Sequence, residues 1–207
     1  LEYNFKENIR TSLQYKKIGR DYYTAGNPSL NSSYTGYDGL LGKYEYALDN
    51  IMFYGYLENY DEFEADTTNN KIKYLIFDNS VKRKFGENDE LTFSTYFKNS
   101  KSDDDSTDKF KSTYKLIYAT KIKQARINAN INYSKTDDKT LTNSDSKTKG
   151  FSVSYSDRFI KNNMYFSMLV MGNKTESLTS TDRKFFMISN NINHKLIPNK
   201  LLLTANF

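Results

Sequence analysis

The chain has 207 residues and a formal net charge of +5, and it contains 18 Tyr and 14 Phe but neither Cys nor Trp. The absence of Cys excludes a disulfide framework and a thiolate metal site. The longest apolar run, around residues 51–57, is far shorter than the roughly 18 residues of a membrane-spanning helix. The basic residues form no dense block among 25 acidic ones, so nucleic acid is not an expected partner.

Apolar and polar residues alternate with a period of two in several parts of the chain. The clearest segments, in chain order, are 9–16, 40–46, 91–98, 125–134 and 151–156. In the fourth segment Ile127 and Ile131 lie on one side and asparagines on the other. Successive side chains of a strand leave on opposite faces, so these segments predict strands that separate two different environments.

Three segments carry apolar residues on both sides, namely 51–57, 72–77 and 164–171. In a barrel their inner side chains would contact a plug, a neighbouring subunit or other aromatic residues within the lumen.

Short turns and longer polar connections alternate along the chain. The short turns centre near residues 7, 49, 87, 124, 162 and 198 and, from the second onward, recur about every 37 residues. The longer connections are 17–34, 65–70, 99–109, 135–148 and 174–183. This alternation leaves about 12 residues per strand, and a tilted strand needs about 9 to 11 to cross a bilayer. It is typical of a meander whose two ends face different compartments.

The predicted fold class is therefore all-β, an antiparallel up-and-down transmembrane β-barrel of about 12 strand segments that is part of a larger barrel. Residues 1–207 form a single barrel segment. We expect it to be truncated at both ends, because residues 1–5 resemble the end of an arriving strand and the last strand leaves a short turn. The alternative is a soluble β-sandwich or the single-layer sheet of a surface protein.

The polar side of the predicted strands is the candidate inner face. It carries more positive than negative groups, which favours anionic solutes if it lines a lumen. The residues predicted to face the lumen are Arg10, Lys16, Lys43, Lys98, Asn128, Asn130, Asn132, Ser152, Ser154 and Arg158, with Lys111 and Lys115 on the same side. The opposite side is expected to contact outer-membrane lipid.

One loop and the strand after it resemble a known family. Residues 25–30, Ala-Gly-Asn-Pro-Ser-Leu, are followed by Tyr34 and then by 37–46, Tyr-Asp-Gly-Leu-Leu-Gly-Lys-Tyr-Glu-Tyr. This stretch resembles the GNP-x-L and G-x-x-Y segment in the later half of TonB-dependent receptors. The resemblance implies a location in the outer membrane of a Gram-negative bacterium, an outer-loop turn at Gly26, Asn27 and Pro28, and a plug domain. The plainer interpretation is a tight turn formed by Gly and Pro.

No residue pattern predicts catalysis, a metal site or a cofactor. Asp103, Asp104, Asp105 and Asp108 lack the glycine and ligand spacing of a calcium loop and are interpreted as a solvated acidic loop. His194 is the only histidine, and Ser189 lies on the opposite face by parity, so a hydrolase is not expected. An uptake receptor, a porin, and a secretion or surface-assembly barrel with partner subunits remain the functional alternatives.

Overall fold

The structure, a computed structural model, describes residues 2–6, 8–18, 36–63, 71–140, 144–159, 164–197 and 201–206. All the regular secondary structure in these ranges is β-strand. The strands are β1 (Glu2–Lys6), β2 (Ile9–Ile18), β3 (Gly36–Leu48), β4 (Ile51–Phe63), β5 (Lys71–Phe85), β6 (Asp89–Ser102), β7 (Asp108–Ile122), β8 (Ala125–Asp138), β9 (Ser146–Phe159), β10 (Met164–Ser177), β11 (Arg183–Ile197) and β12 (Leu201–Asn206). No helix in the described residues is long and apolar enough to cross a membrane.

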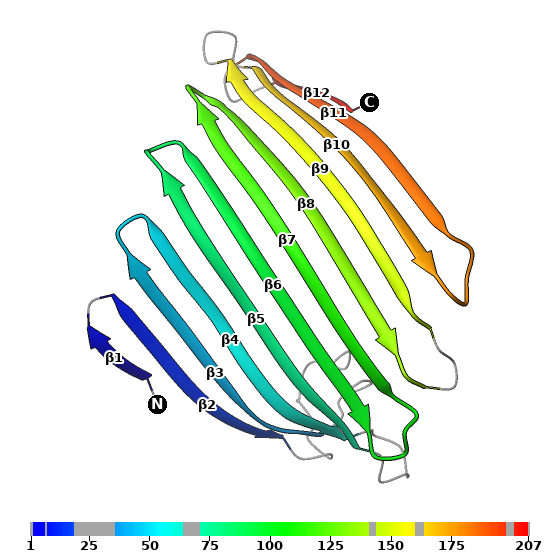
Figure 1. The fold of residues 1–207 in the computed structure, drawn as a ribbon. Coiled ribbons are helices and arrows are strands. Elements are labelled where there is room, and N and C mark those ends of the chain that lie inside the picture. Colours follow the sequence, from blue (N-terminus) through cyan, green and yellow to red (C-terminus); the bar gives the residue numbers. More distant parts are fainter. Residues whose placement is uncertain are drawn as a thin grey trace.

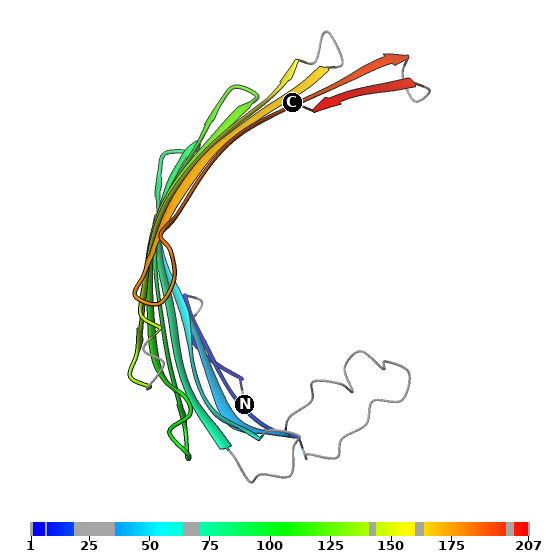
Figure 2. The ribbon, with the colours of Figure 1, turned by 90° about the vertical axis from the view of Figure 1, so that its right-hand side faces the viewer.

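The strands form one 12-stranded sheet in the order of the sequence, and consecutive strands pair antiparallel (Figure 1). The described sheet is a single curved layer that does not close on itself, with β1 and β12 at its two edges (Figure 2). This arrangement confirms the predicted up-and-down meander. It contradicts the soluble β-sandwich, because all the described strands belong to one sheet and none of them forms a second layer.

Three short turns follow the predicted positions. Strand β3 ends at Leu48 and β4 begins at Ile51, and β7 ends at Ile122 and β8 begins at Ala125. Asp49 and Lys123, in these two-residue turns, have φ angles of 45° and 56°. Gly86, in the three-residue turn between β5 and β6, has a φ angle of 72°. Tight hairpin turns require such left-handed residues, because their twist matches that of the strands.

The longer connections are shorter than the sequence predicted. Residues 99–102, 135–138 and 174–177 were expected in loops, yet they continue β6, β8 and β10. The expectation was wrong because polar side chains mark where a strand leaves an apolar environment, and the backbone ladder continues beyond that point. Strands β3–β11 therefore have 13 to 15 residues rather than about 12.

Cross-strand register separates the sheet into two faces. We define the apolar face as the one that carries Leu13, Phe77, Phe93, Ile131 and Ile188, which the paired strands place on the same side. The opposite side is the polar face. Among the exposed large hydrophobic residues, only Tyr54, Tyr165 and Phe185 lie on the polar face, and Leu178 lies beyond β10.

Curvature distinguishes the two faces further. On the polar face Ser80, Ser102 and Asp138 are 6%, 1% and 4% exposed, whereas Leu13, Phe93 and Ile131 on the apolar face are 54%, 45% and 63% exposed. A bent sheet crowds side chains on its concave side and spreads them on its convex side, so the polar face is concave. Two small residues on the apolar face are buried nonetheless, Ser112 opposite Phe97 and Gly172 opposite Phe151.

Two glycines on the apolar face lie under aromatic rings. Gly55 pairs with Tyr44 on one side and Asn79 on the other, so the Tyr44 side chain crosses it. A Cβ at Gly55 would lie 2.3 Å from the Asp78 carbonyl oxygen, and one at Gly172 would lie 2.8 Å from the Phe151 ring. An aromatic side chain that covers a cross-strand glycine fixes the register of the sheet.

Candidate functional site: the polar concave face

All ten residues predicted to face a lumen lie on the polar face. The register connects them through a few cross-strand pairs: Arg10 with Glu45, Ser12 with Lys43, Lys98 with Ile76 and with Lys111, and Asn132 with Lys115. The full set on this face is Arg10, Lys16, Lys43, Lys98, Asn128, Asn130, Asn132, Ser152, Ser154 and Arg158. The period-two pattern therefore predicted which residues share a face.

Asparagines of β8 bond to serines of β9. Asn128 Nδ2 donates to Ser154 Oγ at 3.3 Å, and Asn130 Nδ2 donates to Ser152 Oγ at 3.4 Å. Each amide keeps further polar atoms for other partners, and the buried Oδ1 of Asn130 has no hydrogen bond among the described residues. These short polar side chains form a hydrophilic wall.

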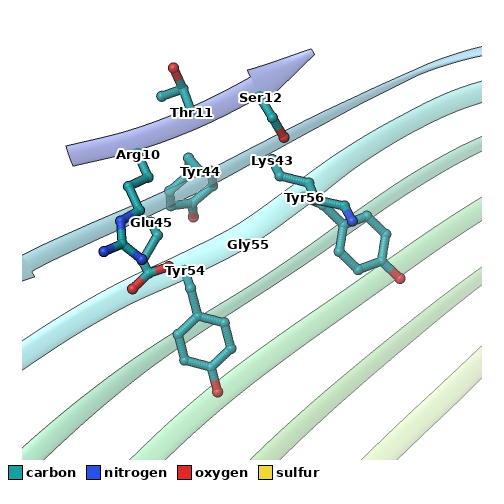
Figure 3. A pocket seen from close by; sticks show the side chains of 9 residues that line it. All are labelled: Arg10, Thr11, Ser12, Lys43, Tyr44, Glu45, Tyr54, Gly55 and Tyr56. Atoms are coloured by element: carbon teal, nitrogen blue, oxygen red, sulfur yellow. The ribbon is translucent and has the colours of Figure 1, made fainter. Parts of the chain in front are cut away.

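A hollow of about 710 Å³ lies along β2, β3 and β4 (Figure 3). Its polar-face lining consists of Arg10, Ser12, Lys43, Glu45, Tyr54 and Tyr56. Figure 3 shows these side chains standing together in front of the strands. The hollow combines charged groups of both signs with two phenol rings.

Aromatic side chains occupy the polar face where alternation fails. The rings of Tyr60 and Tyr74 stack with their centroids 4.7 Å apart, and the Lys98 ammonium lies 4.4 Å from the Tyr74 centroid. Ile76, which follows Tyr74 on the same face of β5 and pairs with Lys98, is only 7% exposed. Of the three explanations for segment 72–77, the structure therefore supports aromatic residues that pack on the inner face.

Three of the lysines on the polar face of β6 and β7 are Lys98, Lys111 and Lys115, and the first of them contacts Tyr74. Lys98 pairs directly with Lys111 across β6 and β7, and Lys115 follows on the same face of β7. Like charges in directly opposite positions destabilise a sheet. Lys111 and Lys115 have no ion pair among the described residues, whereas the nearby Lys82 binds Glu90 at 2.9 Å. We call Lys98, Lys111 and Lys115 the central lysine cluster.

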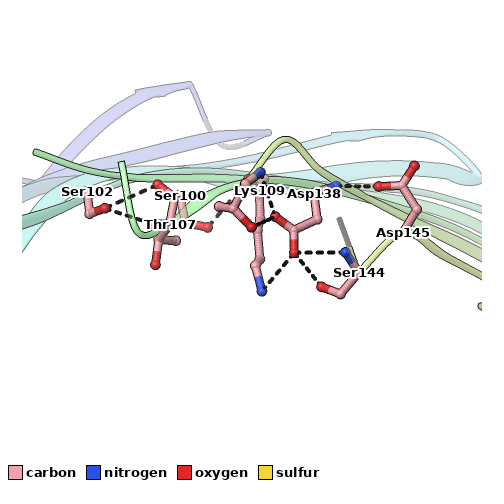
Figure 4. Close-up of polar contacts among 8 residues, drawn as sticks. Ser100, Ser102, Thr107, Lys109, Asp138, Ser144 and Asp145 are labelled. Atoms are coloured by element: carbon pink, nitrogen blue, oxygen red, sulfur yellow. Dashed lines mark hydrogen bonds and ion pairs between the residues drawn. The ribbon is translucent and has the colours of Figure 1, made fainter. Parts of the chain in front are cut away.

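At the end with the longer connections, Asp138 binds Thr140, Ser144 and Asp145 (Figure 4). Its carboxylate accepts from Thr140 N and Oγ1 at 3.0 and 2.6 Å, from Ser144 N at 3.2 Å and from the Ser144 hydroxyl. Lys109 Nζ lies 3.3 Å away, and Asp138 N donates to Asp145 Oδ1 at 2.6 Å. The Asp138 carboxylate therefore binds Thr140, Ser144 and, on β7, Lys109, while its backbone N–H binds Asp145.

The acidic residues near 103–108 have separate partners. Asp103 binds Lys73 at 2.9 Å, Asp104 accepts from Ser106 N at 3.0 Å, and Asp105 lies 3.8 Å from Lys101. No group of three or more potential ligand side chains in the described ranges is arranged to hold a metal ion. The acidic segment therefore forms local contacts rather than one cluster.

Other sequence predictions fall on parts that the structure does not describe. The turn residues Gly26, Asn27 and Pro28 lie outside the described residues. His194 pairs with Met164 and Leu203 through the backbone of β11, and its side chain is likewise outside the description.

Two features of the polar face were missed. The Tyr60–Tyr74 stack was missed because alternation within 72–77 places Tyr74 on a face but does not show its neighbour. Only the pairing of β4 with β5 places Tyr60 opposite Tyr74. The Asp138 contacts had a sequence signal, since Asp followed by Thr and Ser commonly bonds to nearby backbone amides.

The fold, but not the sequence, resembles solved proteins. No model of a known protein family matches the chain, and no curated protein does. The siderophore receptor PirA from Pseudomonas aeruginosa matches over 99% of this chain and 39% of its own, with a TM-score of 0.74 and 10% identity. OmpT of Vibrio cholerae, an outer membrane protein whose loop L8 deletion mutant was also solved, matches over 93% of this chain with a TM-score of 0.58 and 13% identity.

This chain spans about two fifths of the length of PirA and about two thirds of OmpT, 67% of the deletion mutant and 64% of the outer-membrane expressed form. At these identities the comparison shows the fold. The chain has the fold of an outer-membrane β-barrel, with a sheet that corresponds to part of such a barrel. This result confirms the predicted fold class and agrees with the predicted location in a bacterial outer membrane.

Proposed function

We propose that this chain belongs to an integral outer-membrane β-barrel whose polar face lines a pathway for small anionic solutes. The observation that carries the proposal is the contrast between the faces of a single curved sheet. Leu13, Phe93 and Ile131 are exposed on the convex side, where a water-facing sheet would lose free energy, about 25 cal/mol per Å² of apolar area. Hydrocarbon around the barrel removes that cost.

The described sheet then forms one arc of a larger barrel, with residues 1–207 as a single segment. Neighbouring strands would pair with the edges at β1 and β12, since unpaired edges do not occur in hydrocarbon. The match to a receptor more than twice as long supports this view.

The charge of the polar face indicates the class of solute. Its cations outnumber its acids, and the central lysine cluster forms no ion pair with any acid in the part of the chain that the structure describes. The described cations are Arg10, Lys16, Lys43, Lys82, Lys84, Lys98, Lys109, Lys111, Lys115, Lys121, Arg126, Arg158 and Arg183, against Glu45, Glu58, Glu62, Asp78, Glu90 and Asp138. A cationic wall raises the local concentration of anions and lowers that of cations.

Two kinds of pathway fit this wall, an uptake receptor with a plug inside the barrel and an open porin. The TM-score of 0.74 with a siderophore receptor favours the receptor. Neither kind requires catalysis, and Ser152 and Ser154 of the polar face bond to asparagine amides rather than to a general base.

The test is the reversal potential of the full-length protein in a planar bilayer between unequal KCl concentrations. The proposal predicts preference for chloride, directly if the barrel is open and after removal of any plug if it is closed. Preference for potassium contradicts it.

A further inference from the structure

A second group of lysines lies on the convex side, at the end of the sheet with the longer connections. We define the outer lysine patch as Lys135, Lys147, Lys149, Lys174 and Lys184, which the register of β8–β11 places on the apolar-face side. The lysines follow the apolar residues without a gap. In the register, the row of Ile131, Phe151, Gly172 and Phe186 is followed by the row of Tyr133, Lys149, Lys174 and Lys184.

The patch brings like charges together. Lys135 pairs with Lys147, and Lys174 pairs with Lys149 on one side and Lys184 on the other. Such pairs cost free energy unless anions lie near them.

The acids near the patch offset only part of its charge. Asp137 binds Lys135 at 2.6 Å, and Glu176 binds Lys174 at 2.5 Å. From the adjoining connections, the charge of Asp145 attracts Lys135 and the charge of Asp182 attracts Lys174. Glu176 also lies opposite Lys147 in the register, and its charge attracts Lys147 and Lys149. Lys147, Lys149 and Lys184 are exposed and have no ion pair within 4.0 Å among the described residues.

The same level of the sheet looks different at β2–β6. There Lys17 binds Asp38 at 3.5 Å, Lys71 binds Asp61 at 2.6 Å and Lys73 binds Asp103 at 2.9 Å, each on the apolar-face side. These lysines have acidic partners within the protein. Lys135 and Lys174 of the outer lysine patch have such partners too, but Lys147, Lys149 and Lys184 do not, which indicates that an additional anion from outside the described residues binds there.

We infer that the outer lysine patch binds the phosphate groups of a glycolipid in the outer leaflet, with lipid A as the representative. This inference depends on the membrane location in the proposed function. Acyl chains would lie along Ile131, Phe151 and Phe186, which are 63%, 46% and 64% exposed, while the phosphates meet Lys149, Lys174 and Lys184 in the next row. Ammonium groups at a membrane surface attract anionic headgroups, and their aliphatic stems remain in the apolar region.

The test compares lipid binding by the full-length protein in detergent, measured by native mass spectrometry. The probes are bis-phosphorylated lipid A and the same lipid without phosphates. The test variant is Lys149→Gln/Lys174→Gln/Lys184→Gln, and the matched control is Lys17→Gln/Lys71→Gln/Lys73→Gln. We expect the test variant to lose at least tenfold in affinity for the phosphorylated lipid, the control to change less than twofold, and all three proteins to bind the dephosphorylated lipid equally weakly.

Equal binding of both lipids by the unmodified protein, or full affinity in the test variant, overturns the inference. Displacement of the lipid by equimolar inorganic phosphate also overturns it, since the site then recognises phosphate alone. Circular dichroism of the test variant verifies that the sheet is intact. The anion preference of the pathway, measured separately, should be the same in the test variant, so failure of one proposal is distinguishable from failure of the other.

Discussion

The Tyr44 hydroxyl donates a hydrogen bond to Asn79 Oδ1 across Gly55, on the apolar face of the sheet. Three strands meet in this contact, because Tyr44 belongs to β3, Gly55 to β4 and Asn79 to β5. A polar pair on a surface that faces hydrocarbon has no water to replace either partner. Although the contact is exposed on the surface of the sheet, it therefore stabilises the register of these three strands.

Removing one partner of this pair should destabilise the barrel. Tyr44→Phe leaves Asn79 without its donor and should lower the free energy of unfolding by about 1 kcal/mol, measured by urea titration in lipid vesicles. Tyr44→Phe combined with Asn79→Val removes both polar groups and should recover most of that loss. Tyr114→Phe, on the same face and with no hydrogen bond described for its hydroxyl, is the control. Equal losses in the single and the double variant contradict this account.

The central lysine cluster should determine ion preference. Lys98→Gln/Lys111→Gln/Lys115→Gln removes three positive charges from the polar face, so the chloride-to-potassium permeability ratio should fall toward one. The control is Lys17→Gln/Lys71→Gln/Lys73→Gln, which removes three charges from the convex side and should leave the ratio unchanged. If both variants shift the ratio equally, the net charge of the protein rather than its polar face sets the preference.

Asp138 should keep its hydrogen bonds to Thr140 and Ser144 down to acidic pH. The residue lies at the end of β8, beyond the roughly 11 residues that cross a bilayer from the short turn. The hydroxyls of Ser144 and Thr140, which donate to the carboxylate, hold the pKa of Asp138 well below its usual range. Because the folded pKa is lowered, the stabilisation is present above the unfolded pKa of about 3.9 and is lost as pH falls through the folded value.

Hydrogen exchange of the Thr140 and Ser144 amides checks this prediction. After correction for intrinsic rates, their protection should stay constant from neutral pH to about pH 4 and decrease below it. Asp138→Asn should weaken protection at every pH, whereas Asp137→Asn, whose carboxylate faces Lys135, should not. Constant protection in Asp138→Asn is the result that contradicts the role of this carboxylate.

Sequence alone predicted the faces and the short turns, and it did so for a local reason. Parity within a strand depends only on neighbouring residues, so the alternation in 125–134 already placed Asn128, Asn130 and Asn132 together. Tight turns such as Asp49–Asn50 likewise depend on a few adjacent residues.

The remaining features depend on register or on distance along the chain. The ends of β6, β8 and β10 were wrong, because polarity does not distinguish a strand outside the bilayer from a loop. The outer lysine patch unites residues from 135 to 184, and only the pairing of β8–β11 shows that Lys149, Lys174 and Lys184 form one row.

Neighbouring residues on opposite faces should respond differently to a charge. Ile131→Glu places a carboxylate on the apolar face and should cost on the order of 2 kcal/mol of unfolding free energy in lipid vesicles. Asn132→Glu places the same group opposite Lys115 on the polar face and should be neutral or slightly stabilising. Similar losses at both positions contradict the assignment of the faces.

The assignment of the convex side to hydrocarbon is the central claim, and spin labelling along 125–134 tests it most directly. The 207 residues contain no Cys, so a cysteine introduced at one position at a time is the single labelling site among them. In lipid vesicles, labels at 127, 129, 131 and 133 should be accessible to dissolved oxygen, and those at 128, 130, 132 and 134 to a water-soluble nickel complex. Access of the nickel complex to both sets, or the opposite alternation, contradicts the claim.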